Sequence, residues 1–175
     1  VAISFSKIYN YAISYLVHYP KLSLYYAPLP HMTISFFYRI LGVSFFTARF
    51  TVLLFAVATI LIMYKFLKTF FNSKVALFST IVFSVMPVIY YDSISVMTDV
   101  PYMFFFILAM YFYLKALDSK TKRFFILAAV SATLAFLAKW NAIVIVPIIL
   151  MYALIEKRVQ MKNVLLSFAL MALML

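Results

Sequence analysis

The chain alternates between long apolar runs and short polar turns, and charged residues occur only near the ends of the runs. A helix needs about 20 apolar residues to cross the hydrocarbon core of a bilayer, and most of the runs approach that length. The pattern therefore predicts transmembrane helices over residues 45–66, 75–90, 98–117, 124–138 and 142–155, and the start of a further span near Val164.

The first 41 residues have a different pattern, which favours helices lying along the membrane surface. Apolar side chains recur at helical spacing through residues 1–26, among many tyrosines, and tyrosine is well suited to the depth of the lipid headgroups. Prolines at positions 20, 28 and 30 predict a loop. A short helix over 32–41 is expected to follow and to end at Gly42, a suitable C-cap residue.

These patterns describe a single transmembrane region over residues 1–175. Within it we expect interfacial helices of an outer loop at 1–41 and transmembrane spans at 45–175, the last of them incomplete. The chain starts without Met and ends inside an apolar run, so we expect it to be an internal or truncated part of a longer protein.

Composition supports a membrane protein. Hydrophobic residues make up 68% of the chain and charged residues 11%, whereas soluble domains are roughly half apolar and a quarter charged. A single Gly and the lack of alternating ten-residue strands argue against an outer-membrane barrel. The predicted fold class is all-α: a polytopic transmembrane helical bundle.

The net charge of +11 is explained by membrane topology rather than by nucleic-acid binding, because the basic residues flank apolar runs instead of forming one patch. Alternate turns hold ten of the fifteen Lys and Arg residues, which places these turns in the cytoplasm. The N-terminal region, the loop around 92–99 and the turn at 139–141 then share the outer face. The ten residues are Lys65, Lys68, Lys74, Lys115, Lys120, Lys122, Arg123, Lys157, Arg158 and Lys162.

Three charged residues on this predicted outer face are candidates for chemistry. Asp99 opens the third span and is one of only four acidic residues; it is either a functional carboxylate or the N-cap of its helix, a role that Thr98 could equally fill. Lys139 lies in a tight turn and Arg49 one turn into the first span. Either cation is suited to a donor phosphate or to the headgroups of bulk lipid.

The remaining candidates are polar or aromatic residues expected near the same face. Tyr26, His31 and Asn141 are candidate substrate contacts, although such a Tyr-rich stretch is also typical of an aromatic belt. The two His residues, 18 and 31, have no metal-ligand spacing, and the acids are too few for a convincing oxygen site. No cofactor or metal is assigned, and a divalent cation is left open.

The order of several short segments resembles the GT-C class of membrane glycosyltransferases, in the branch of protein O-mannosyltransferases and lipid A aminoarabinose transferases. The resemblance covers nearly the whole chain and rests on the order of motifs that are each weak alone. The segments are Tyr25-Tyr26-Ala27-Pro28-Leu29-Pro30, Leu41-Gly42-Val43-Ser44 followed by Ala48-Arg49-Phe50, Ser73-Lys74-Val75-Ala76-Leu77, Met86-Pro87 with Tyr90-Tyr91 and then Thr98-Asp99-Val100-Pro101, and Leu134-Ala135-Phe136-Leu137-Ala138-Lys139-Trp140-Asn141.

The resemblance implies a hexosyl or pentosyl transferase that moves a sugar from a polyprenyl-phosphate donor to a protein or lipid acceptor on the extracytoplasmic face. Lys139 and Arg49 would hold the donor phosphate, and Asp99 would support catalysis. The family usually carries an acid early in its first outer loop, thought to be the base, and no acid precedes Asp92 here. The main base is therefore expected upstream of Val1.

Two other functions are alternatives: a membrane transporter or flippase, and a non-catalytic membrane scaffold. A transporter predicts polar residues at mid-membrane depth, inverted repeats and broken helices. The spans hold only scattered Ser and Thr and no charged residue near a midpoint. A scaffold would lack the expected upstream acid.

Overall fold

The computed structural model describes residues 27–119, 121–155, 169, 172 and 173. Across 27–119 and 121–155 the regular secondary structure is entirely helical, which confirms the predicted all-α fold for this part of the chain. The interfacial helix predicted within 1–26 lies outside the described residues, as does most of the span predicted from Val164. The elements are α3 (Pro28–Leu41), α4 (Phe45–Leu67), α5 (Ser73–Ser84), α6 (Pro87–Ile94), α7 (Asp99–Ser119), α8 (Lys122–Ala138), the 3₁₀-helix η1 (Trp140–Val144) and α9 (Ile145–Ile155).

Side-chain caps set the starts of the first two predicted spans. The Ser44 hydroxyl accepts a hydrogen bond from the Thr47 amide at 3.1 Å, and α4 begins at the next residue, Phe45. In the same way Asn72 Oδ1 accepts from the Val75 amide at 2.9 Å, just before α5. Each cap satisfies an amide that has no partner inside its own helix.

Helix α3 begins four residues earlier than predicted. The stretch around Pro28 and Pro30, expected to be a loop, forms the first turn of the helix. Proline is well suited to a first turn, because its fixed φ is helical and the amide that it lacks would have no partner there. The predicted C-cap is confirmed: Gly42 has φ 81°. Its amide donates to the Tyr38 carbonyl at 3.0 Å.

The second predicted span, 75–90, is broken rather than continuous. Helices α5 and α6 are separated by Val85 and Met86 and are bent by 55° relative to each other. Pro87 explains the break, because it cannot donate the next helical hydrogen bond and its ring clashes with the carbonyl one turn earlier. Pro101 causes no such break, since it lies in the first turn of α7.

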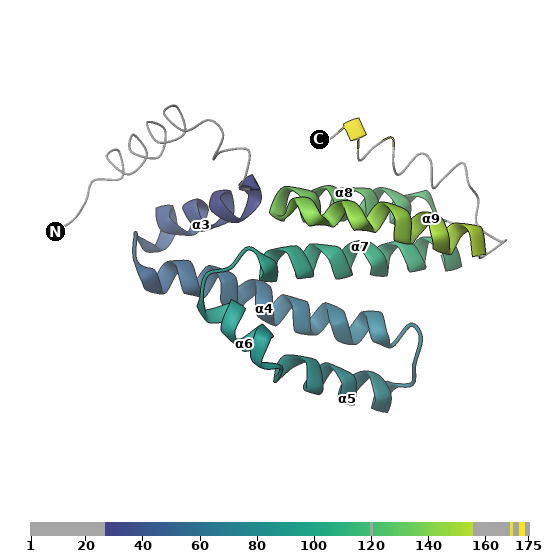
Figure 1. Cartoon of the computed structure of the whole chain (residues 1–175), viewed down its shortest axis with the longest axis horizontal. Coiled ribbons are helices and arrows are strands. Elements are labelled where there is room, and N and C mark those ends of the chain that lie inside the picture. Colours follow the sequence, from purple (N-terminus) through teal and green to yellow (C-terminus); the bar gives the residue numbers. More distant parts are fainter. Residues whose placement is uncertain (1–26, 120, 156–168, 170–171, 174–175) are drawn as a thin grey trace.

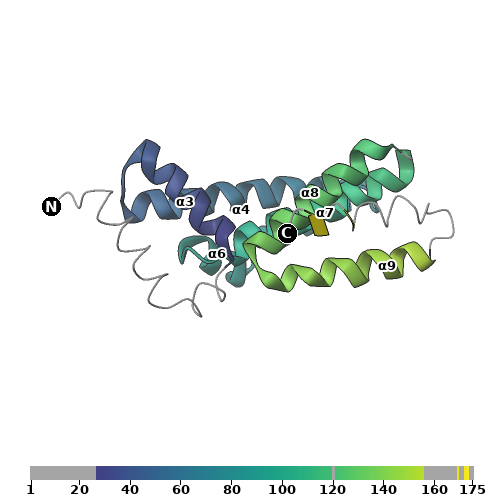
Figure 2. The same cartoon turned by 90° about the horizontal axis from the view of Figure 1, so that it is seen from above.

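The helices form an elongated bundle with α7 in its middle. Figure 1 shows α7 between α4 on one side and α8 on the other, with the bent α5–α6 pair beside α4. Figure 2, seen from above, shows that α9 lies in front of α7 and α8 rather than in line with them. Helix α3 contacts both α4 and α8.

The basic turns lie together at one end of the bundle, as the charge pattern predicts. The α4–α5 turn, the α7–α8 turn and the end of α9 share one end, here called the basic end, while the α6–α7 loop and the α8–η1 turn lie at the opposite end (Figure 1). The described residues that flank the turns of the basic end are Lys65, Lys68, Lys74, Lys115, Lys122 and Arg123.

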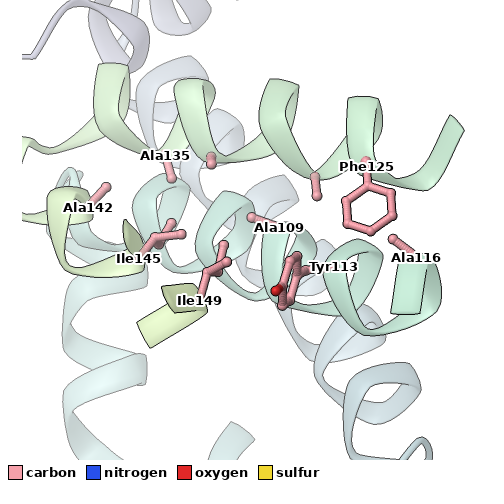
Figure 3. Packing of buried hydrophobic residues seen from close by; sticks show 10 residues of the cluster. Ala109, Tyr113, Ala116, Phe125, Ala135, Ala142, Ile145 and Ile149 are labelled. Carbon is pink, nitrogen blue, oxygen red and sulfur yellow. The ribbon is translucent and has the colours of Figure 1, made fainter. Parts of the chain in front are cut away.

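The contact between α7 and α8 is an alanine seam, formed on α8 by Ala128, Ala132 and Ala135. These side chains recur every three or four residues and are at most 4% exposed. Between membrane helices, small side chains allow the backbones to approach closely and gain packing contacts. Figure 3 shows the seam with its neighbours from the other helices, which are Ala109, Tyr113 and Ala116 of α7, Ala142 of η1, and Ile145 and Ile149 of α9.

Tyr113 is the largest fully buried side chain of the described core. Its ring packs edge-on against Phe125 and Tyr152, with centroid separations of 6.2 and 6.4 Å. Among the described residues, its hydroxyl has no hydrogen-bond partner. An unpaired buried polar group costs about 1–3 kcal/mol, so the contribution of Tyr113 to stability comes from the packing of its ring.

By length and composition, α4 with 23 residues and α7 with 21 can cross a membrane, and the bent α5–α6 pair is a third candidate. Helix α8 has 17 residues, a rise of about 25 Å, and the apolar stretch Trp140–Tyr152 is also short. The first and third predicted spans are therefore confirmed as helices of membrane-spanning length, the second is a bent pair, and the fourth and fifth are helical but shorter. These apolar helices indicate an integral membrane protein.

Candidate active site

Asp99 and Lys139 form an ion pair at the end of the bundle opposite the basic end. The Lys139 Nζ donates a hydrogen bond to Asp99 Oδ1. Each side chain is 33% exposed, so the pair is accessible from outside the protein. Two candidates separated by 40 residues in sequence are thus in direct contact.

The local fold explains why these two charges meet. Asp99 is the first residue of α7 and Lys139 immediately follows α8, and since the two helices are antiparallel, these ends coincide. The helix dipole favours an anion at the N-terminus and a cation at the C-terminus. Each partner therefore occupies the favourable end of its own helix.

The backbone of Lys139 is held on both sides. Its amide donates to the Ala135 carbonyl at 2.9 Å, and its carbonyl accepts from the Ala142 amide at 3.0 Å. Between these bonds Lys139 is extended, with φ −159° and ψ 129°. The chain therefore leaves α8 and enters η1 with the lysine fixed at the turn.

The structure shows which residue caps α7, a position that the sequence left open between Thr98 and Asp99. The Thr98 carbonyl accepts from the Tyr102 amide at 3.1 Å, and Asp99 is already inside the helix. Its carboxylate bonds to Lys139 rather than to a backbone amide. Asp99 is therefore not the N-cap residue of α7, and a functional role for its carboxylate stays a prediction.

Tyr102 is a neighbour of the pair that sequence reasoning missed. It lies three residues after Asp99, hence on the same face of α7, and interacts electrostatically with both Asp99 and Lys139. Its ring packs edge-on against Phe106 at 5.6 Å. The three-residue spacing from Asp99 could have indicated Tyr102 from the sequence. It did not stand out because 20% of the chain is aromatic.

The loop that leads to Asp99 contains a strained residue, Val96. Its φ of 56° is the one positive φ outside glycine in the described residues. A left-handed conformation costs an L-residue about 1–2 kcal/mol, and a β-branched side chain is unusual there. Packing against the buried cluster of Val52, Ala56 and Val100 holds Val96 in place.

Because of this conformation, glycine is expected to be more stable than alanine at position 96, the reverse of the usual order inside a helix. Val96→Gly is expected to be about 1 kcal/mol more stable than Val96→Ala, because both lose the same valine contacts and only alanine keeps a Cβ at positive φ. The measurement is the free energy of unfolding of the full-length protein in mixed micelles. Val52, inside α4, is the control: there alanine is expected to be more stable than glycine by about 1 kcal/mol. The same order at both positions would contradict the left-handed loop.

Among the described residues, none of the other predicted site residues forms an ion pair with Asp99 or Lys139. Arg49 is exposed on the first turns of α4. His31 is exposed in the first turn of α3, and Asn141 is exposed in η1, two residues after Lys139. Tyr26 lies outside the described residues.

The partly exposed lysine is the group of this pair that could bind an anion. Within the described ranges, no group of three His, Asp or Glu side chains is placed to hold a metal ion. A partly exposed ammonium group at a helix end can bind a phosphate, with an aromatic ring and a carboxylate beside it. Trp140 adds a second ring, packed edge-on against Phe136 at 4.9 Å.

Comparison with known proteins identifies the family of this chain. The sequence model described as dolichyl-phosphate-mannose-protein mannosyltransferase matches residues 26–175, a range that includes Asp99, Lys139 and all the described helices. No curated protein and no solved structure matches the chain. The match confirms the resemblance to GT-C glycosyltransferases seen in the ordered motifs.

Proposed function

This chain belongs to the dolichyl-phosphate-mannose-protein mannosyltransferase family, which is of the GT-C type, and we propose that it transfers a hexose or pentose from a polyprenyl-phosphate donor to a protein or lipid acceptor. The observation that supports this most directly is the accessible Asp99–Lys139 pair at one end of a membrane bundle. Lys139 is the phosphate-binding cation in this proposal.

In the proposed reaction, an acceptor oxygen or nitrogen forms a bond to the anomeric carbon of the sugar. The bond between that carbon and the phosphate oxygen breaks, and its electrons leave with the phosphate. The acceptor proton passes to a base. Lys139 stabilises the charge that develops on the leaving phosphate, and Arg49, exposed on α4, supplies a second cation.

Asp99 has a supporting role in this proposal, because its carboxylate is already engaged by Lys139. It orients the ammonium group and lies near the reacting sugar. Asn141 and His31, both exposed, are proposed substrate contacts together with Tyr26.

The proposed reaction takes place on the extracytoplasmic face. The basic end carries six described Lys and Arg residues beside its turns, and such residues favour the cytoplasmic side. The Asp99–Lys139 pair is at the other end of the bundle (Figure 1).

The broken α5–α6 pair does not favour the transporter alternative. Transporters use interrupted helices whose exposed backbone binds substrate or ions near the middle of the membrane. Here the break consists of the apolar residues Val85 and Met86, which are 71% and 50% exposed, with no charged side chain at the break itself.

The test is a transfer assay with membranes that contain the full-length protein. Polyprenyl-phosphate donors carrying labelled mannose, another hexose or a pentose are supplied in parallel, and at least one is expected to pass its label to a protein or lipid acceptor. Membranes without the protein are the control. Transfer from a nucleotide sugar in membranes depleted of the lipid donor would overturn the proposal.

A further inference from the structure

The Asp99–Lys139 pair should affect both the binding of a phosphate at Lys139 and its release. This inference rests on the proposed phosphate site at Lys139. In the structure the ammonium group already has an anionic partner, Asp99. Any phosphate that binds Lys139 must therefore displace this carboxylate or remain close to it, and like charges in one site repel.

The repulsion differs between the two ends of the proposed reaction. The donor is a phosphodiester with one negative charge, whereas the product, a polyprenyl phosphate monoester, carries about −1.5 to −2 at neutral pH. The interaction of Asp99 with the phosphate scales with that charge. A lone lysine would bind the product more tightly than the donor, which would slow turnover.

We propose that Asp99 is a specificity-determining residue, which repels the lipid phosphate bound at Lys139 and so weakens binding of the doubly charged product more than binding of the singly charged donor. Rearrangement of the pair is feasible because both side chains are 33% exposed. When Lys139 binds phosphate, the N-terminus of α7 still stabilises the Asp99 carboxylate. When phosphate leaves, Lys139 returns to Asp99.

The chain offers a matched control for this role. Asp92 is a partly buried acid at the same end of the bundle, on α6, and the Lys139 ammonium contacts Asp99 and not Asp92. Asp92→Asn and Asp99→Asn remove the same charge from neighbouring positions. A general change in surface charge would therefore affect both variants alike.

The experiment measures binding of two lipid probes to the purified full-length protein at pH 8. One probe is polyprenyl phosphate, which is doubly charged at this pH, and the other is its methyl phosphodiester, which has the same lipid and a single charge. Asp99→Asn is expected to tighten binding of the diester about three-fold, within the range of partly exposed ion pairs, and binding of the monoester about ten-fold, because doubling the charge squares the factor. Asp92→Asn is expected to change either value less than two-fold.

Equal tightening of both probes by Asp99→Asn, or weaker binding of either, would overturn the inference, as would equal effects of the two Asn variants. If Asp99→Asn lowers the amount of folded protein, Asp99→Ser provides the same comparison. Lys139→Ala separates this inference from the proposed function. If Lys139→Ala binds neither probe, the phosphate site is supported. If Asp99→Asn then changes the affinity for the two probes equally, only the inference about Asp99 is refuted. Unchanged binding of both probes to Lys139→Ala would refute the phosphate site itself.

Discussion

Replacing Lys139 by alanine is expected to lower the rate of sugar transfer by about a hundred-fold or more. This is the usual effect of removing one group that stabilises charge in a transition state. Lys139 is the cation held at the turn after α8, in contact with Asp99. The measurement is the initial rate of transfer from the polyprenyl-phosphate donor. Lys139→Arg keeps the charge with a different shape and is expected to retain part of the activity.

Two controls distinguish a lost phosphate contact from a damaged fold. Lys74→Ala removes an exposed lysine at the basic end and is expected to leave the rate unchanged. Lys139→Ala also leaves Asp99 without its partner, so the double variant Asp99→Asn, Lys139→Ala is compared with it. If the double variant recovers wild-type activity, the unpaired Asp99 carboxylate, rather than the missing lysine, caused the loss of activity in Lys139→Ala. That result would contradict the role of Lys139 as the phosphate-binding cation.

Ala135→Leu is expected to destabilise the protein by about 2–3 kcal/mol. Ala135 is 0% exposed and belongs to the alanine seam, where extra methyl groups must push α7 and α8 apart. The same change should lower transfer, since the Ala135 carbonyl accepts the Lys139 amide and displacement of α8 moves the lysine.

The free energy of unfolding in mixed micelles measures this effect. Leu127→Phe is the control, because it enlarges a side chain on the same helix that is 41% exposed. It is expected to change stability by less than about 0.5 kcal/mol. Equal losses for the two variants would mean that α7 and α8 do not pack through the alanine seam.

The positions of the helices followed from the sequence because apolar run length and charge placement act over many residues. Helix α4, for example, was predicted over 45–66 and observed as Phe45–Leu67. The start of α3 was missed because proline serves both as a loop residue and as a first-turn residue. The break after Ser84 was missed because a proline near a helix end was expected to be tolerated, as Pro101 is in α7.

The candidate site was predictable only in part. Topology placed Asp99 and Lys139 at one face, but their contact depends on the register between α7 and α8, which the alanine seam determines. Arg49 was expected beside them; it is exposed on a different helix, α4, and forms no ion pair with Asp99. The strain at Val96 has no sequence signal, because a valine in a left-handed turn is held there by packing alone.

The alanine seam also fixes the length of the segment that joins it to Lys139. Each residue of a helix turns the chain by about 100° and raises it by about 1.5 Å. One residue inserted between Ala135 and Lys139 would rotate the lysine away from Asp99 while the alanines of the seam kept their places. Selection on a pair of charges at one end of the bundle therefore constrains insertions and deletions in the last turn of α8.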